Sequence, residues 1–161
     1  PTSDRVKESL FNILGSTVAE KRVLDLFAGT GALGLEALSR GAASAVLVDR
    51  STGGIIRTNA QRTGLTPRTK VMTGDVFAVL AGLAKKNLLF DLVFCDPPYG
   101  KGLWQRALQA LDGADLLAAG ALVVVEHGAA DVEMPPLERL YKTDDRRYGH
   151  TTRLSFFRQT G

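Results

Sequence analysis

The segment Asp96-Pro97-Pro98-Tyr99 is the part of the sequence best suited to chemistry. Neither proline has an N–H, and Pro98 holds Pro97 in an extended conformation, so the segment offers oxygen acceptors without competing donors. An exocyclic amine of guanine or adenine is a weak nucleophile because its lone pair is delocalised into the ring. If Asp96 and the Pro97 carbonyl accept its two hydrogens, the nitrogen becomes more tetrahedral. This indicates attack of a base amine on a sulfonium methyl group, helped by positioning and electrostatics.

Tyr99 extends this interpretation to the substrate. An aromatic ring binds any nucleobase by stacking, so Tyr99 is predicted to lie on a target base that has been taken out of its stack. The alternative is an ordinary tyrosine at the rim of a loop. The reaction needs no metal ion, and none is expected, since Cys95 is the single cysteine and His127 and His150 are isolated from any candidate carboxylate ligands.

A glycine-rich turn lies earlier in the chain, after an apolar run. Gly29, Gly31 and Gly34 have the G-x-G-x-x-G spacing that lets a backbone approach a ligand closely and turn into a helix. Asp49 follows Gly29 by 20 positions, where doubly wound folds hold the hydroxyl groups of a ribose. The pattern predicts a cofactor that contains adenosine, but an NAD-dependent oxidoreductase would satisfy it equally well.

Two further acids favour a cofactor with an amino-acid tail. Asp25 lies just before the glycines, where its carboxylate would repel a pyrophosphate but would hold an ammonium group or fix the turn. Asp75, between Gly74 and Val76, follows another apolar run. It is expected either to accept a hydrogen bond from an adenine amino group or to cap the next helix. Spacing alone leaves these alternatives open.

Strands and helices alternate along the chain, as an α/β sheet requires. Strands are predicted at Arg22 to Phe27, Ser44 to Asp49, Lys70 to Thr73, Phe90 to Cys95 and Ala121 to Glu126. Helices are predicted at Leu33 to Ser39, Gly54 to Thr63, Val76 to Lys85 and Leu103 to Leu111, and in the opening stretch around Val6, Leu10, Phe11 and Leu14. Two final strands, Leu137 to Thr143 and Thr151 to Arg158, would form an antiparallel hairpin around a turn at 144–149.

The bulk composition is that of an ordinary soluble domain. The chain has 161 residues, 45% hydrophobic and 23% charged, which fits a single ordinary domain over residues 1–161. No apolar run could span a membrane, and the lone cysteine fits a reducing cytoplasm. The net charge of +3 and the cations of the last third of the chain suggest a basic surface. Because the sequence opens on Pro1, an N-terminal segment is expected to precede it.

Three residues near these motifs receive structural interpretations. Trp104 lies on the apolar stripe of its predicted helix and is expected to pack in the core. Cys95 is expected to be a small buried hydrophobe. Glu126, at the end of the fifth strand, is interpreted as an exposed strand end in preference to a substrate contact.

Together these motifs resemble the RsmD-type bacterial 16S rRNA guanine-N2 methyltransferases. The resemblance covers essentially the whole chain. It is carried by the opening from Pro1 to Leu14, the block from Asp25 to Ala42 and the Asp96-to-Tyr99 loop, found in that order. The family implies a class I, Rossmann-like fold with helices on both faces of a mostly parallel seven-stranded sheet, which ends in an antiparallel hairpin. Many relatives have glutamate where this chain has Asp49.

The resemblance also implies a cofactor, a partner and site residues. The cofactor is S-adenosyl-L-methionine, and the partner is 16S ribosomal RNA within the small ribosomal subunit or an assembly intermediate. The protein is expected to act as a monomer without a membrane or a metal. Catalysis falls to Asp96, Pro97, Pro98 and Tyr99. Cofactor binding falls to Asp25, Phe27, Gly29, Thr30, Gly31, Asp49, Arg50, Gly74, Asp75 and Val76. Substrate contacts are expected from Arg5, Tyr99, Arg146 and Arg147.

Three alternatives remain open at this point. An adenine-N6 methyltransferase acting on DNA or RNA would use the same Asp96-to-Tyr99 loop, although the DNA enzymes usually carry a further reading domain. In an NAD-dependent oxidoreductase the Asp96-to-Tyr99 loop would have no evident function. A non-catalytic RNA-binding module would keep the fold without turnover, but the intact motifs argue against it.

Overall fold

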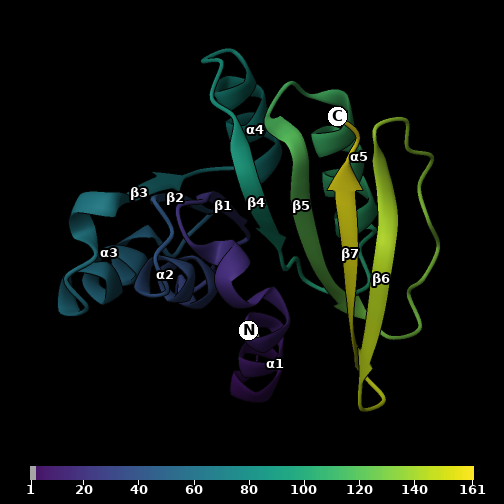
Figure 1. Ribbon diagram of the computed structural model, residues 1–161, viewed down its shortest axis with the longest axis horizontal. Coiled ribbons are helices and arrows are strands. Elements are labelled where there is room, and N and C mark those ends of the chain that lie inside the picture. Colours follow the sequence, from purple (N-terminus) through teal and green to yellow (C-terminus); the bar gives the residue numbers. More distant parts are fainter. Residues whose placement is uncertain (1–2) are drawn as a thin grey trace.

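The computed structural model describes residues 3–161 and contains one continuous sheet flanked by helices (Figure 1). Pro1 and Thr2, which belong to the opening that resembles the family, lie outside the described residues. The sheet has seven strands in the order β3-β2-β1-β4-β5-β7-β6. This confirms the predicted sheet. No helix among residues 3–161 has the length and apolar character of a membrane span.

The five parallel strands are β1 (Arg22–Leu26), β2 (Ser44–Asp49), β3 (Thr69–Thr73), β4 (Phe90–Cys95) and β5 (Leu117–Gly128). The predicted positions of the first four are confirmed to within one residue. The fifth extends beyond the predicted Ala121 to Glu126 at both ends. The five helices within residues 3–161 are α1 (Asp4–Leu14), α2 (Ala32–Ser39), α3 (Gly53–Arg62), α4 (Val76–Ala84) and α5 (Leu103–Gly113). Short 3₁₀ turns, η1 (Gly15–Val18) and η2 (Thr66–Arg68), join neighbouring elements.

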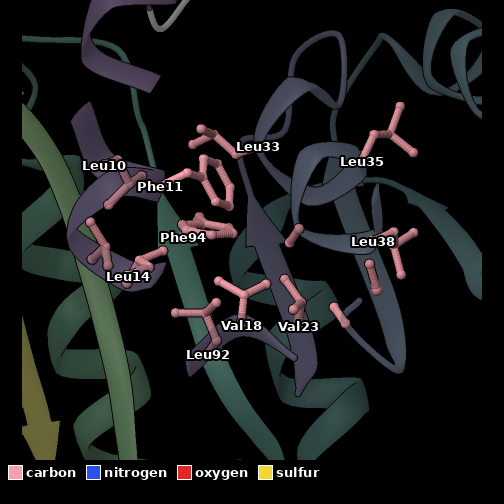
Figure 2. Packing of buried hydrophobic residues seen from close by; sticks show 14 of the residues in the cluster. Leu10, Phe11, Leu14, Val18, Val23, Leu33, Leu35, Leu38, Leu92 and Phe94 are labelled. Carbon is pink, nitrogen blue, oxygen red and sulfur yellow. The ribbon is translucent and has the colours of Figure 1, made fainter. Parts of the chain in front are cut away.

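Helices cover both faces of the sheet because successive strand residues point to opposite sides. Helices α1, α2 and α3 pack on one face with the strand side chains Val23, Phe94 and Val124. Helices α4 and α5 pack on the other face with Val93 and Val125. Figure 2 shows the first of these clusters, in which Leu10, Phe11 and Leu14 of α1 lie against the strands beside Leu33 of α2.

The opening helix α1 begins as its sequence requires. Ser3 is the N-cap, and its hydroxyl accepts a hydrogen bond from the Val6 N–H at 3.2 Å. Phe11 of α1 packs against Phe94 of β4 with ring centroids 5.8 Å apart. This contact fixes the last turn of α1 over the carboxyl end of β4.

The hairpin β6 (Leu140–Tyr148) and β7 (Thr152–Gln159) is antiparallel, as predicted, but its turn is misplaced in the prediction. Residues 144–148 continue β6, and the chain turns only at 149–151. Charged residues are stable here because β6 is the outermost strand and exposes most of its side chains. Asp145 also pairs with Arg153 of β7 at 2.6 Å. A run of charged residues therefore predicts a turn from the sequence, although it forms an edge strand in the structure.

Candidate active site

The carboxyl ends of β1, β2 and β4 meet at one edge of the sheet. Leu26 pairs with Val48 on one side and with Cys95 on the other. The residues that follow these positions, Phe27, Asp49 and Asp96, are thereby brought together. In open α/β sheets this edge, at the point where the strand order reverses, is where ligands bind.

A cavity of about 900 Å³ opens at this edge. It gathers residues from the opening helix, all the βα turns of that edge and the hairpin. Its lining consists of Ser3, Val6, Phe27, Asp49, Arg50, Ser51, Asp75, Val76, Phe77, Asp96, Pro97, Pro98, Tyr99, Lys101, Leu103, Arg106, Glu126 and Thr152. The Asp96-to-Tyr99 loop and the acids at the ends of β2 and β3 thus share one cavity.

Close packing favours glycine at two positions of the first turn, and backbone conformation favours it at a third. A Cβ on Gly31, whose φ is +84°, would lie 3.0 Å from a Leu47 methyl carbon. A Cβ on Gly34 would lie 3.0 Å from Leu47 and 3.1 Å from the Asp25 carboxylate. Gly29 also has a positive φ of +59°. The motif therefore lets α2 start directly against Leu47 of β2.

Asp49 ties the first two βα turns together. Its Oδ1 accepts from the Gly29 N–H at 3.1 Å, and its Oδ2 accepts from the N–H groups of Ser51 at 3.0 Å and Thr52 at 3.1 Å. Burial alone would raise the pKa of Asp49, but these hydrogen bonds outweigh it and hold the pKa below its ordinary value. Asp49 is therefore a fixed carboxylate at the cavity wall.

Asp25 holds the glycine turn from beneath. It is 1% exposed, and its Oδ2 accepts from the Gly34 N–H at 2.9 Å. Burial raises its pKa to about 7; the Gly34 hydrogen bond lowers it, and the nearby charges of Asp96 and Asp49 raise it further. Of the two roles open to Asp25 in the sequence, the structure contains the turn-fixing one. Its side chain does not line the cavity.

Asp75 combines two positions that the sequence left as alternatives. It is the N-cap of α4, where its Oδ2 accepts from the Ala78 N–H at 3.0 Å, and it also lines the cavity. The capping interpretation is confirmed. The contact with adenine stays a prediction.

The Asp96-to-Tyr99 loop connects to the hairpin through Tyr99. The Tyr99 hydroxyl lies 3.1 Å from Thr152 Oγ1 and 3.5 Å from Glu126 Oε2, while 45% of the residue is exposed. Burial raises the pKa of the Tyr99 hydroxyl, and the charges of Glu126 and Asp96 raise it further. The tyrosine ring is thus held beside two carboxylates and still presents a surface to a ligand.

Sequence reasoning missed several lining residues. Glu126 is only 7% exposed, so its interpretation as an exposed strand end is wrong: β5 runs two residues further and is covered by its partner β7. Arg106 of α5 lies 3.7 Å above the Phe77 ring of α4, a cation–π contact. Phe77 in turn meets Phe27 edge to face at 6.4 Å. No local pattern marks these side chains, because their partners lie on other elements.

Some predicted site residues lie outside the cavity lining. Arg5 is exposed on α1. Arg146 pairs with Asp144 at 3.0 Å, and Arg147 donates to the Gly149 carbonyl at 3.1 Å, both on the outer strand β6. The backbone of Thr30 is used structurally, since its carbonyl accepts from the Asn59 amide at 2.9 Å.

The residues given structural interpretations are buried behind the site. Trp104 stacks on His127 with ring centroids 4.5 Å apart, and its Nε1 donates to Asp131 at 3.0 Å. His127 is 2% exposed and lies 2.8 Å from Ser155 Oγ, and burial lowers its pKa. Cys95 is buried, and burial raises the pKa of its thiol. The core interpretations of Trp104 and Cys95 are confirmed.

The strand order with its antiparallel β7, the glycine turn after β1 and the Asp-Pro-Pro-Tyr loop after β4 define a Rossmann-like methyltransferase. Residues 1–158 match the family model described as "Conserved hypothetical protein 95". The chain belongs to this family, that of the RsmD-like methyltransferases.

Two sequence relatives illustrate the family. YlbH of Bacillus subtilis, whose name assigns it provisionally to the rRNA methyltransferases, is 38% identical over 154 residues, covering 94% of this chain and 83% of its own length. Ribosomal RNA small subunit methyltransferase D of Escherichia coli is 40% identical over 128 residues, covering 78% of this chain. That alignment covers 63% of the Escherichia coli protein.

Solved structures share the fold. An Escherichia coli chain named yhhF has a TM-score of 0.86 at 31% identity, covering 99% of this chain and 87% of its own. An RNA methyltransferase from Salinibacter ruber, solved with S-adenosyl-L-homocysteine, has a TM-score of 0.73 at 18% identity, covering 99% of this chain and 94% of its own. The second likeness is one of fold alone.

Proposed function

We propose that this protein transfers a methyl group from S-adenosyl-L-methionine to the exocyclic N2 amine of a guanine in small-subunit ribosomal RNA. One observation carries the proposal. The acceptor-rich Asp96-to-Tyr99 loop shares a cavity with the acids that end β2 and β3, so an amine and an adenosine cofactor would meet in one space. The Escherichia coli relative, named for small-subunit rRNA, supports the choice of substrate.

The charge of the site suits a cationic cofactor. Within residues 3–161 the cavity lining contains four carboxylates and three cations, so negative charge is in slight excess; these residues are Asp49, Asp75, Asp96 and Glu126, and Arg50, Lys101 and Arg106. S-adenosyl-L-methionine supplies a methyl group activated by a positively charged sulfur. In this proposal Asp49 accepts from the ribose hydroxyls, and Asp75 with Val76 holds the adenine. The turn that contains Gly29 and Gly31 is assigned to the methionine portion.

The residues at the end of the cavity that would hold the target base would act on its exocyclic amine. The Asp96 carboxylate and the Pro97 carbonyl accept the two N–H hydrogens, which favours a tetrahedral nitrogen with an available lone pair. Tyr99 stacks on the base and holds it in line with the activated methyl group. Once the nitrogen has gained a methyl group it must lose a proton, and the Asp96 carboxylate is the acceptor that lies at hand. Positioning and electrostatics supply most of the acceleration.

The test uses tritium-labelled S-adenosyl-L-methionine and small ribosomal subunits from cells that lack the enzyme. After the reaction the RNA is digested to nucleosides, and the label is identified. Label in N2-methylguanosine is the expected result. Label in N6-methyladenosine would replace guanine by adenine as the target. If the protein binds the cofactor but transfers no label, the result would favour the alternative of a non-catalytic RNA-binding module.

The same assay addresses the RNA substrate. Naked 16S RNA, isolated subunits and assembly intermediates are offered in parallel at equal concentration. We expect the subunit or an assembly intermediate to be methylated fastest, since a small enzyme can read the shape of a folded particle. Equal rates on naked RNA would show that the particle is not required.

A further inference from the structure

Asp96 and Glu126 lie at corresponding positions near the carboxyl ends of two neighbouring strands. Strands β4 and β5 are parallel, with Cys95 opposite Val125, so Asp96, which directly follows β4, lies at the same height as Glu126 within β5. Phe94 and Val124, two positions before them, both face the cluster under α1. Alternation along the strands therefore directs Asp96 and Glu126 to the same face, and both line the cavity.

Glu126 occupies the deeper of these two positions. It is 7% exposed, and Leu154 of β7 lies opposite it in the sheet. Its Oε2 is 3.5 Å from the Tyr99 hydroxyl, which also contacts Thr152. Tyr99 thus connects two parts of the cavity. Its ring would stack on a base, and its hydroxyl contacts the Glu126 carboxylate.

An ionised carboxylate accepts hydrogen bonds and donates none. Guanine presents two adjacent donors on its Watson–Crick edge, the ring N1–H and the exocyclic N2 amine. Adenine presents its amine beside an N1 that carries only a lone pair. A carboxylate next to the amine-binding acceptors therefore attracts guanine and repels adenine. Sites built around such hydrogen bonds reject analogues that lack the donor by large factors, because a buried polar group is left unpaired.

We propose that Glu126 determines the specificity of the site for guanine by accepting the hydrogen bond of the ring N1–H. Asp96 and the Pro97 carbonyl then accept the hydrogens of the neighbouring N2 amine. This inference rests on the proposed function, since it concerns the same base. It gives the buried carboxylate at the end of β5 a role that the Asp-Pro-Pro-Tyr loop alone does not supply, because that loop serves either base amine.

The experiment compares guanine with 2-aminopurine at the methylated position of the RNA. Both bases carry the same exocyclic N2 amine, but 2-aminopurine has a bare N1 acceptor. The wild-type protein is expected to prefer guanine by about a hundredfold or more in kcat/KM. Glu126→Gln, whose amide can accept from N1–H through its oxygen or donate to a bare N1 through its NH2 group, is expected to gain activity on 2-aminopurine and so to lose most of the preference. Glu133→Gln, the same charge change at an exposed position outside the cavity, serves as the matched control.

The ratio of kcat/KM for guanine to kcat/KM for 2-aminopurine separates a role of Glu126 in base selection from a purely structural role. A merely structural Glu126 would lower activity on both substrates equally and leave the ratio unchanged, and that result overturns the inference. Equal use of both bases by the wild type overturns it without any variant. Cofactor affinity, measured by titration calorimetry, is expected to stay within about twofold in Glu126→Gln. If the wild type labels adenine, the proposed function fails together with this inference; if it labels guanine but ignores the N1 position, only this inference fails.

Discussion

The two ends of the cavity are built in different ways. At the end assigned to the cofactor, Asp49 and Asp75 accept hydrogen bonds from backbone N–H groups, most of them two or three positions away. At the end assigned to the target base, Tyr99 reaches Glu126 and Thr152, 27 and 53 positions away. The first end is made by local turns, and the second exists only when three elements have come together. Changes at the two ends should therefore separate cofactor binding from turnover and base choice.

The largest effect is expected from Asp96→Ala, which removes an acceptor of the reacting amine. Turnover should fall by at least about a hundredfold, roughly 3 kcal/mol, while cofactor affinity is retained. Single-turnover methylation with labelled cofactor measures this loss, and calorimetry measures the affinity. Asp115→Ala, at a surface position outside the cavity lining, is the control. Near-normal methylation by Asp96→Ala would remove this residue from the mechanism.

Asp25→Asn tests the buried carboxylate under the glycine turn through pH. Burial raises the pKa of Asp25 to about 7, so between pH 4 and pH 7 the folded state holds a proton that the unfolded state has released. This contribution stabilises the protein at low pH and is lost as the pH rises toward 7. Between pH 5 and pH 8 the free energy of unfolding of the wild type should fall by about 3 kcal/mol relative to the variant.

Urea denaturation at the two pH values measures this difference. Asp112→Asn is a control with the opposite behaviour. Burial alone would raise the pKa of Asp112, but hydrogen bonds from the N–H groups of Glu138, Leu140 and Arg139 outweigh it and hold the pKa below its ordinary value. The contribution of Asp112 to stability is therefore complete above pH 5. The difference in the free energy of unfolding between the wild type and Asp112→Asn should not change between pH 5 and pH 8. A parallel pH dependence of wild type and Asp25→Asn would contradict the shifted pKa.

Asp49→Ala sharpens the description of the cofactor end. It removes the carboxylate expected to accept from the ribose, and it frees the N–H groups of Gly29, Ser51 and Thr52. Affinity for S-adenosyl-L-methionine should weaken by about 1–3 kcal/mol. Titration calorimetry checks this, and thermal melting without cofactor separates the loss from unfolding. Unchanged affinity would move the ribose contact to another residue.

Tyr99→Phe should have the smallest effect, because it keeps the ring and removes only the hydroxyl that reaches the hairpin. We expect KM for the RNA substrate to rise severalfold, about 1 kcal/mol, with kcat nearly unchanged and cofactor affinity intact. Steady-state kinetics measures the split. Tyr141→Phe, on the exposed side of β6, is the control. A loss confined to kcat would assign the hydroxyl to the chemical step in place of base positioning.

Most of the fold was predictable because the parallel strands are short segments with apolar cores, such as Leu92 to Cys95 in β4, and the helices carry buried apolar residues at helical spacing. The hairpin turn was misplaced because residues 144–148 are charged, and charge is tolerated on an outer strand as readily as in a turn. Cross-strand pairing, such as Asp145 with Arg153, decided between the two. No local pattern contains that pairing.

The same division holds in the site. By itself the sequence determined the glycine turn, the acids at the strand ends and the Asp96-to-Tyr99 loop, since these depend on residues close together in the chain. Tertiary structure alone decided that Asp25 is committed to Gly34, that Glu126 is buried, and that Tyr99 meets Thr152. The reason is physical: burial and side-chain pairing depend on which strands become neighbours, and the order β4-β5-β7 joins segments that are distant in the chain.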